Sequence, residues 1–280
     1  MVEQSDWRLL DVTSYSDSGV YVDLYPSIEP IPGTSQNQKR TFKVDFVLIR
    51  NVIKEPMRVG DHTNKFLALM HGKIPSVNSL FSVYCCLEKP ILYGALKEIQ
   101  TKLGKKEFPL IKQYFYSSFR TAIIAPHFPN VAKIGHSHAG YGKMKLEDSE
   151  QFEDLLSVVA LDDHYLSMES FISSTHELRI QKIGEHYRVF KRFSEDWKIN
   201  RSAVHLEDTE MTERYKLWID ECAQIFGGLE LCALDVLVNE DGTETILELN
   251  DTGMGLNYKP EEDHQYVKEV VIDKMRSLFQ

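Results

Sequence analysis

Two apolar runs near the C-terminal end of the chain flank a short polar turn, and this pattern predicts a β-hairpin over Leu231–Asp251. Asp241-Gly242 between the runs is typical of a two-residue type I′ turn, because both positions of that turn need a positive φ. With a turn of this length, Asp235 lies directly opposite Glu248, and Asn250 falls on the same face of the hairpin.

This facing pair of acids predicts a metal site. Opposed residues on neighbouring strands have Cβ atoms only about 5 Å apart, so two carboxylates there repel each other. A divalent cation with oxygen ligands, Mg²⁺ or Ca²⁺, relieves the repulsion and suits Asp235, Glu248 and Asn250 better than a soft metal. Two alternatives stay open: an edge hairpin whose polar side faces water, and a three-residue loop, which would move one strand's residues to the other face.

The N-terminal half shows the order strand, helix, strand. The segment 42–50 has the pattern of a buried parallel strand, a helix is expected over 62–71, and a short strand and turn follow over 72–79. Together they predict a βαβ unit. The next helix is expected to open at Glu88-Lys89-Pro90, which places Lys89 at a helix entrance.

A glycine-rich stretch follows, with three glycines between Lys133 and Lys143. Such a stretch forms a tight loop whose backbone amides can approach an anion. Its spacing is not that of a Walker A motif, and the alternating residues after it indicate a strand, so we expect it to join two strands of a hairpin that folds over phosphates. An ordinary flexible turn is the alternative, and His136 and His138 lack a third ligand for a metal site.

Three further strands are expected over 165–172, 177–184 and 187–192. Their alternation of polar and apolar residues predicts that Arg179 and Lys191 share one polar face. Apolar residues at helical spacing predict amphipathic helices over 147–159, over 212–226 and from residue 260 onward.

Composition narrows the class of protein. The chain has 280 residues and a formal net charge of −10, which argues against general affinity for nucleic acid or an anionic membrane and leaves a local basic patch open. The polar, acidic N-terminus does not resemble a secretory signal, and no stretch approaches the roughly 18 apolar residues of a membrane span. The cysteines form no CxxC pair, so reduced thiols are expected. These features predict a cytoplasmic protein of one or two domains.

Several motifs together resemble the central domain of the synapsins, from about residue 40 to the end of the chain. They are Phe46–Arg50, Pro75–Ser79, Glu88-Lys89-Pro90, Gly135–Lys143, Arg179–Gly184, Tyr215–Trp218 and Ile225–Leu229. The resemblance implies an α/β (α+β) ATP-grasp fold with a glycine-rich lid hairpin. It implies a small pre-ATP-grasp domain over residues 1–88 and an ATP-grasp domain over 89–280, with a lid subdomain over about 121–168. An apolar strand that precedes residues 8–25 in the family has no counterpart here, which leaves open whether the first domain is complete.

The resemblance also assigns candidate binding residues. Lys89 and Lys133 match the family's nucleotide lysines, Lys143 closes the lid loop, and the two acids of the predicted metal site match its metal-binding acids. The backbone from Glu169 to Ile172 would meet the adenine. With ATP and Mg²⁺ or Ca²⁺ as cofactors, the candidate nucleotide-binding residues are Lys89, Lys133, Gly140, Gly142, Lys143, Glu169, Phe171, Ile172, Arg179 and Lys191.

A synapsin-like protein is expected to bind ATP, to lie peripherally on synaptic or secretory vesicles and to regulate neurotransmitter release. Implied partners are a vesicle phospholipid surface, the cytoskeleton and further copies of the chain. The family's N-terminal phosphorylation segment and proline-rich tails have no counterpart here, which leaves kinase-regulated tethering open. Glu248-Leu249-Asn250 matches the acid-x-Asn pattern of ATP-grasp ligases. Two alternatives therefore remain: a carboxylate ligase acting through an acyl-phosphate, and an inactive self-associating scaffold.

Overall fold

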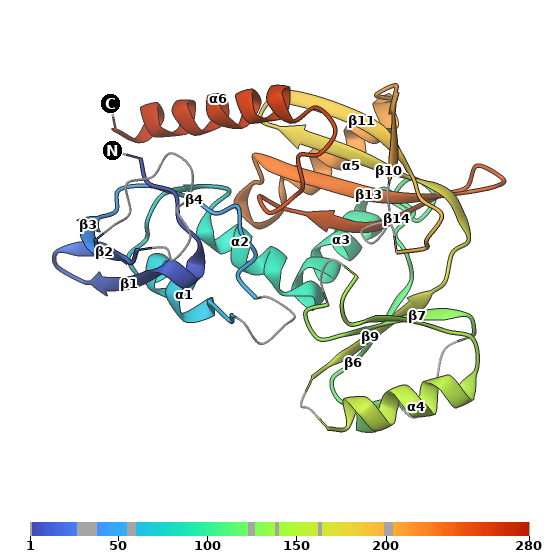
Figure 1. Cartoon of the computed structure of the whole chain (residues 1–280). Coiled ribbons are helices and arrows are strands. Elements are labelled where there is room, and N and C mark those ends of the chain that lie inside the picture. The colour runs from blue at the N-terminus through green and yellow to red at the C-terminus, as the bar shows by residue number, and fades with distance from the viewer. Residues whose placement is uncertain are drawn as a thin grey trace.

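Four β-sheets form the framework of the described part of the chain (Figure 1). The computed structural model describes residues 2–26, 38–54, 60–122, 127–137, 140–161, 164–198 and 204–279. A three-stranded and a two-stranded sheet lie in the N-terminal part, a five-stranded sheet forms the centre, and a four-stranded sheet forms a lid. This arrangement confirms the mixed α/β class expected from the sequence.

The N-terminal part contains the predicted βαβ unit. Strands β4 and β5 pair in parallel and are joined by α1, while β1, β2 and β3 form an antiparallel sheet beside them. The N-terminal elements are η1 (Trp7–Leu9), β1 (Leu10–Tyr15), β2 (Gly19–Leu24), β3 (Arg40–Lys43), β4 (Val47–Leu48), α1 (Thr63–His71), β5 (Ser76–Val77) and α2 (Leu80–Leu87).

The prediction of one buried strand over 42–50 is wrong. Strand β3 ends at Lys43 and pairs with β2, whereas β4 begins at Val47 and pairs with β5. The apolar residues of this segment are divided among three packing clusters, with Val44 in one, Ile49 in another, and Phe46 and Leu48 packed against a third. The pattern of apolar positions cannot distinguish one long strand from two short strands that serve different sheets.

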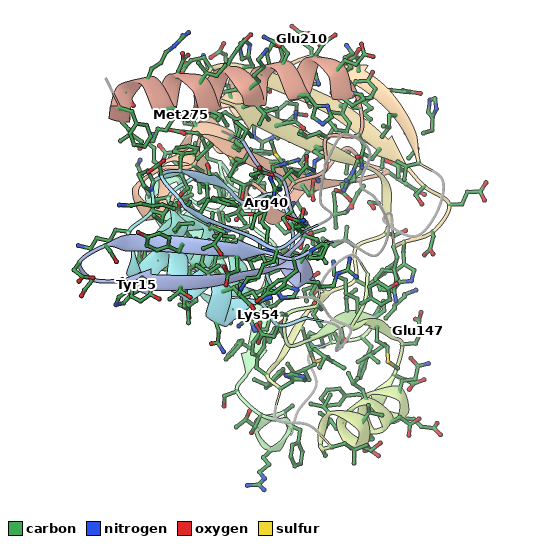
Figure 2. All side chains as sticks on the ribbon, turned by 60° about the vertical axis from the view of Figure 1, so that its left-hand side comes forward. Tyr15, Arg40, Lys54, Glu147, Glu210 and Met275 are labelled. Atoms are coloured by element: carbon green, nitrogen blue, oxygen red, sulfur yellow. The ribbon has the colours of Figure 1, made fainter. Side chains whose placement is uncertain are left out.

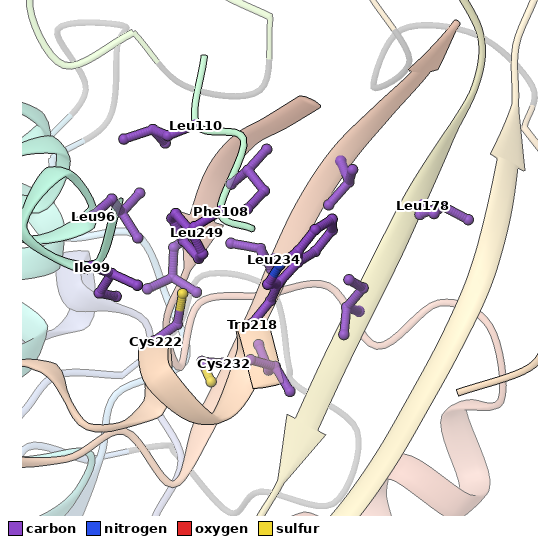
Figure 3. Packing of buried hydrophobic residues seen from close by; sticks show 14 of the residues in the cluster. Leu96, Ile99, Phe108, Leu110, Leu178, Trp218, Cys222, Cys232, Leu234 and Leu249 are labelled. Carbon is purple, nitrogen blue, oxygen red and sulfur yellow. The ribbon is translucent and has the colours of Figure 1, made fainter. Parts of the chain in front are cut away.

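The central sheet has the order β12-β11-β10-β13-β14 and is antiparallel throughout. Helices α3 and α5 pack on one face, where side chains such as Leu96, Trp218 and Leu234 form the largest core (Figure 3). Helix α6 packs against the other face near one end. The central elements are α3 (Lys89–Leu103), β10 (Ser174–Ile183), β11 (His186–Phe193), β12 (His205–Thr209), α5 (Glu213–Ala223), η4 (Ile225–Gly227), β13 (Leu231–Asn239), β14 (Glu244–Asn250) and α6 (Pro260–Phe279).

The lid sheet has the order β6-β9-β7-β8 and lies apart from the N-terminal sheet, with α4 packed on its outer side (Figure 1). Strands β7 and β8 form the predicted hairpin around the glycine-rich loop. The lid elements are β6 (Gln113–Tyr116), η2 (Phe119–Thr121), β7 (Asn130–Ile134), β8 (Lys143–Leu146), α4 (Ser149–Val159) and β9 (Leu166–Ser170).

Apolar runs also predict short strands over 108–111 and 121–125, and the structure forms no named strand over the first of them. The segment 108–111 forms only a parallel bridge between Leu110 and Ile246, although the Ile111 amide donates to the Ile246 carbonyl (2.9 Å). Thr121 ends a 3₁₀ turn, and residues 123–125 of the second predicted strand lie outside the described residues. The first lid strand is instead β6, which the apolar pattern did not single out.

The C-terminal hairpin forms, but its turn differs from the predicted one. The Asn239 amide donates to the Thr243 carbonyl (3.0 Å), and the Gly242 amide donates to the Asn239 carbonyl (3.0 Å). The loop between the paired residues is therefore one residue longer than a type I′ turn. Gly242 has φ +79, the left-handed conformation that this longer loop requires at its last position.

A β-bulge in β14 cancels the effect of the longer loop. Val236 pairs with Ile246, but the next pair along the strands is Asp235 with Glu248, because the register shifts between them. The bulge inserts one extra residue, Leu247, into the outer strand. Asp235 and Glu248 thus face each other as predicted, but they do so because the longer loop and the bulge compensate for each other, not because the turn has two residues.

Asn78 joins the N-terminal part to the central sheet. Its side-chain amide donates to the Leu231 carbonyl (2.8 Å), and its side-chain oxygen accepts from the Leu231 amide (2.9 Å). Asn78 is 2% exposed and has φ +39, a backbone conformation that asparagine tolerates better than most residues. This single side chain satisfies both backbone groups at the start of β13.

We expect Asn78→Ala to lower the free energy of unfolding by about 2–4 kcal/mol, because two buried backbone groups lose their partners. Asn78→Gly removes the same hydrogen bonds but tolerates the positive φ, so its loss should be smaller by about 1 kcal/mol. Urea denaturation of the three proteins measures both differences. Wild-type stability in both variants would show that the bridge contributes nothing.

Candidate functional site

A pocket of about 260 Å³ lies between the lid sheet and the central sheet. Lys133 and Glu169 line it from the lid, and Asp235 and Glu248 line it from β13 and β14. Residues 170–176, where the chain passes from β9 into β10, line the pocket between these two walls. The pocket thus gathers residues that lie far apart in the sequence.

Lys133 and Glu169 form a largely buried ion pair on the lid wall. The Lys133 Nζ lies 2.6 Å from the Glu169 Oε1, and their side chains are 12% and 4% exposed. Strands β7 and β9 are neighbours, with Val131 opposite Glu169, so Lys133 meets the carboxylate diagonally. Burial lowers the pKa of Lys133, but the carboxylates of Glu169 and Glu248 outweigh this and leave its pKa raised. Lys133 is therefore a firmly charged cation at the pocket wall.

Glu248 is surrounded by cations from three parts of the fold. Lys143 of the lid has the largest effect, and together with Lys89, Lys133 and Arg192 it holds the pKa of Glu248 well below its usual range, although burial opposes this. Glu248 is therefore ionised across the physiological pH range. Its negative charge is shared among side chains of the lid, of α3 and of the central sheet.

A buried network of two acids and two arginines lies at the floor of the pocket, where Glu177, Asp235 and Arg192 line it and Arg179 lies outside the lining. The Arg179 Nη1 donates to both carboxylate oxygens of Asp235 (2.9 and 3.2 Å), and Arg192 binds Glu177 and lies 3.7 Å from Asp235. Burial and the Asp235 charge raise the pKa of Glu177 to about 8, against the lowering effect of Arg192. Arg179 thus neutralises the charge of Asp235, and Arg192 favours the ionised form of Glu177 against burial and the Asp235 charge.

The predicted repulsion between the facing acids is relieved here by protein cations. Arg179 neutralises Asp235, and the Asn250 Nδ2 donates to the Asp235 Oδ2 (2.9 Å). Among the described residues, no group of three or more His, Cys, Asp and Glu side chains is arranged to hold a metal ion. The donors that fit a hard divalent cation are the carboxylates of Glu248 and Asp235, which line the same pocket from neighbouring strands.

The glycine-rich loop lies at the lid edge of the pocket. Gly140 lines it, and Gly142 accepts a hydrogen bond from the Ile134 amide (2.9 Å), with φ +83 and +66 at the two glycines. Lys198 donates from its Nζ to the Lys143 carbonyl (2.7 Å), so a loop after β11 holds the end of the glycine-rich loop. These backbone conformations require glycine and leave the loop without side chains that would obstruct the pocket.

Phe171 and Ile172 lie where the lid chain passes into the central sheet. Both line the pocket, and the Phe171 ring lies 4.1 Å from the Lys145 Nζ and 6.1 Å from the Trp197 ring. This apolar and aromatic wall stands beside the charged wall of the pocket. A planar ring system bound here would pack against Phe171 and Ile172 on one side and face the lysines of the charged wall on the other.

Lys89 and Asn250 lie just outside this pocket and line a second, smaller cavity. Lys89 still acts on Glu248 through its charge. The structure therefore brings eight of the predicted residues into one pocket and leaves five outside its lining. Those in the lining are Lys133, Gly140, Lys143, Glu169, Phe171, Ile172, Asp235 and Glu248.

The prediction that Arg179 and Lys191 share a face is wrong. Lys191 pairs with Leu178, whose side chain packs in the core with α3 and α5, so Lys191 lies on the opposite face of the sheet from Arg179. Arg192, which pairs with Glu177, lines the pocket instead. The short turn after Ile183 sets this register, and counting back from it would have identified Arg192 from the sequence.

Solved structures with similar folds include several ATP-grasp ligases. The ligase PsnB, complexed with a phosphomimetic variant of its minimal precursor, Mg and ADP, has a TM-score of 0.61 and 13% identity over 95% of this chain and 86% of that chain. The D-alanine–D-alanine ligase of Bacillus anthracis complexed with ATP has a TM-score of 0.57 and 16% identity, covering 83% of this chain and 79% of that chain. At these identities the similarity shows the ATP-grasp fold alone.

Sequence comparison identifies the family. A curated Drosophila melanogaster protein named Synapsin is 37% identical over 99% of this chain, and the chain spans 27% of that protein's length. The family model of the synapsin pre-ATP-grasp domain matches residues 1–76, and that of the synapsin ATP binding domain matches residues 78–277. The domain boundary predicted at residue 88 stays a prediction. The chain belongs to the synapsin family.

Proposed function

We propose that this protein binds ATP in the pocket between the lid and the central sheet. The observation that carries the proposal is the concentration of cations there: Lys133, Lys143 and Arg192 line one pocket, with a glycine loop at its edge. Triphosphate oxygens suit such cations and exposed backbone amides. The wall containing Phe171 and Ile172 would take the adenine. The family model of an ATP binding domain and the nucleotide-bound ATP-grasp neighbours support this proposal.

We propose that a divalent cation, Mg²⁺ or Ca²⁺, accompanies ATP. Glu248 would be its main protein ligand, because this carboxylate stays ionised and lines the pocket opposite Asp235. Asp235 would bind the metal only if its hydrogen bond from Arg179 breaks or is shared with the metal. The side-chain oxygen of Asn250, whose nitrogen donates to Asp235, is a further candidate ligand. When bound, the metal would neutralise phosphate charge next to these acids.

We propose, from family membership, that the protein acts at synaptic or secretory vesicles and helps to regulate neurotransmitter release. The cytoplasmic vesicle phospholipid surface, the cytoskeleton and other copies of the chain are the proposed partners. None of the described helices is both long and apolar enough to span a bilayer. The attachment that family membership suggests is peripheral.

A carboxylate ligase is the second candidate function. The observation that favours it is Glu248-Leu249-Asn250, which matches the acid-x-Asn pattern of ATP-grasp ligases and ends strand β14, with Glu248 in the lining of the pocket and Asn250 in the lining of the second cavity. ADP release that depends on an added carboxylate would favour this candidate over ATP binding alone. Self-association without nucleotide binding would favour the scaffold alternative.

We expect Lys133→Met to weaken ATP binding by about 1–3 kcal/mol, or roughly 5- to 150-fold in Kd, because a charge-assisted hydrogen bond is lost. Combining it with Glu169→Gln avoids leaving a buried carboxylate without a partner. Calorimetry on both proteins measures the effect. Lys102→Met removes another lysine from an ion pair, with Glu221 (2.7 Å), and is the control. An unchanged affinity for ATP in the folded double variant would show that Lys133 does not bind the nucleotide.

We expect Glu248→Gln to reduce the enhancement of ATP binding by Mg²⁺ at least tenfold, because one metal-binding charge is lost while the side-chain size is kept. Without metal, ATP should bind as tightly as to the wild type or more tightly, since the cations around Glu248 are freed for phosphate. Titration of Mg²⁺ and Ca²⁺ at fixed ATP measures this. Glu244→Gln, on the same strand, is the control. A wild-type metal titration in Glu248→Gln would eliminate the proposed metal site.

Although the net charge of −10 gives no general attraction to an anionic membrane, the proposed vesicle attachment predicts that the purified protein floats with phospholipid vesicles and remains at the bottom of the gradient without them. A peripheral protein should be released by raised salt, because such attachment depends on screened charge interactions. Flotation in low and high salt measures both points. Failure to float with vesicles of either neutral or anionic composition would argue against a direct membrane role for this part of the protein.

A further inference from the structure

The glycine-rich loop begins with a contact to the N-terminal part of the chain. His136, the second residue after β7, lies beside Lys54, which belongs to the loop that follows β4. Figure 2 shows Lys54 between the N-terminal sheet and the lid strands. Both side chains line the second cavity, whose walls come from four separate parts of the chain. The contact therefore joins the lid to a residue 82 positions away in the sequence.

Three polar side chains make this contact. The Lys54 Nζ lies 3.2 Å from the His136 Nε2 and 2.8 Å from the Oε1 of Glu88, a residue at the junction of α2 and α3. The Glu88 Oε2 lies 3.7 Å from the His136 Nε2. The side chains of Lys54 and Glu88 are 20% exposed, and that of His136 is 27% exposed. Groups from three segments thus meet at a point that is largely shielded from water.

The geometry of the contact requires a neutral His136. A lysine ammonium group can donate hydrogen bonds but cannot accept one, so the Nε2 beside it must be the acceptor and carries no proton. The neutral ring then has its proton on Nδ1. A second proton on Nε2 would set two donors against each other and break the hydrogen bond from Lys54. The contact with Lys54 therefore weakens when His136 becomes protonated.

The surroundings of His136 act on its pKa in both directions. Burial has the largest effect and lowers the pKa, Glu88 raises it, Lys54 lowers it, and the Leu87 backbone and Asp61 raise it. The net result is a pKa below the value of 6.5 of a free histidine. The contact is therefore fully favourable above pH 6.5 and is lost progressively as the pH falls toward the lowered pKa.

The base of the loop transmits the position of His136 to the lid. The Gly135 amide donates to the Tyr165 carbonyl (2.8 Å), and the Ile134 amide donates to the Gly142 carbonyl across the loop (2.9 Å). The His136 ring meets the Tyr165 ring edge to face, with the ring centroids 5.7 Å apart. A shift of His136 would therefore disturb the hydrogen bonds that close the loop.

The loop has one anchor at each end. Lys198 donates to the Lys143 carbonyl at its far end (2.7 Å), and Lys54 contacts His136 at its start. Gly140 and Lys143, which lie between these anchors or at the second one, line the proposed nucleotide pocket. Lys54 itself is not in the lining of that pocket. Any influence of Lys54 on the nucleotide must therefore act through His136 and the loop.

We propose that Lys54 is a positioning residue for the proposed nucleotide pocket: it holds the start of the glycine-rich loop by donating to the neutral His136 ring. This role rests on the proposed binding of ATP in that pocket. Glu88 accepts from Lys54 and so keeps its ammonium group directed at the loop. The contact itself exists without nucleotide, so it is tested separately from ATP binding.

Hydrogen exchange of the nucleotide-free protein tests the contact, with the Ile134 amide as the reporter because it donates across the loop. We expect the double variant Lys54→Met, Glu88→Gln, which removes both charges together, to lower the protection of this amide at pH 7.5 by at least about threefold. Lys102→Met with Glu221→Gln removes a remote lysine–glutamate pair and should leave it unchanged.

A pH profile separates the contact from a general structural role. Between pH 7.5 and 5.5, with exchange corrected for its intrinsic rate, protection of Ile134 and affinity for ATP should each fall about two- to elevenfold in the wild type. The upper limit applies because a free histidine of pKa 6.5 is about ten parts protonated to one neutral at pH 5.5. His136→Gln keeps an acceptor for Lys54 but does not titrate, so its protection should be the same at both pH values. Protonation of ATP affects both proteins equally and cancels in the ratio of their Kd values.

The outcomes distinguish this proposal from the proposed function. Wild-type protection of Ile134 in the folded double variant would overturn the role of Lys54, and so would a wild-type pH dependence in His136→Gln. ATP affinity that does not change together with Ile134 protection would show that the contact does not position the loop for the nucleotide. Absence of ATP binding by the wild type at pH 7.5 would overturn the proposed function, and the exchange data would still decide whether Lys54 holds the loop.

Discussion

The pocket depends on the balance between one ionised carboxylate and the cations around it. Glu248 draws Lys133 and Lys143 of the lid and Lys89 of α3 toward one point on the central sheet. Without Glu248, these positively charged side chains would repel one another in the confined pocket. The negative charge of Glu248 offsets this repulsion and allows the cations to lie close together. The same charge relation favours the approach of the lid to the sheet and gathers cations where the proposed nucleotide phosphates would bind. Structure and proposed function share one electrostatic cause.

The local part of this arrangement could be predicted from the sequence. Turn residues and alternating strands identified the C-terminal hairpin, the glycine-rich hairpin and the pair formed by Asp235 and Glu248. The predicted pairing of these two acids is confirmed, although the turn on which the prediction rested is not. The longer loop shifts the register by one residue, and the bulge at Leu247 shifts it back. Nothing in the residue types near Leu247 marks a bulge, because its position depends on how both strands meet their neighbours in the sheet.

The long-range part could not be predicted in this way. The bridge between Asn78 and Leu231 joins segments that no local pattern connects, and the second cavity takes its walls from four separate segments. The sequence of the hairpin alone does not indicate the arginines beside Asp235, because they come from other strands of the sheet. In the folded chain, β10 supplies Arg179 from the other side of β13, so the neighbouring strand removed the repulsion that the hairpin alone would show.

The pair formed by Lys133 and Glu169 has a consequence for ligand affinity. The Glu169 Oε1 lies 2.6 Å from the Lys133 Nζ, so the lysine that would bind a phosphate in the proposed site is already paired with a carboxylate. Glu169 is thus an internal competitor, and any anion must offer Lys133 a better partner than the one it already has. Weakly charged ligands gain little from the exchange, whereas a polyanion gains more with each added charge. The proposed nucleotide pocket would in this way discriminate among anions by their charge density as well as by their shape.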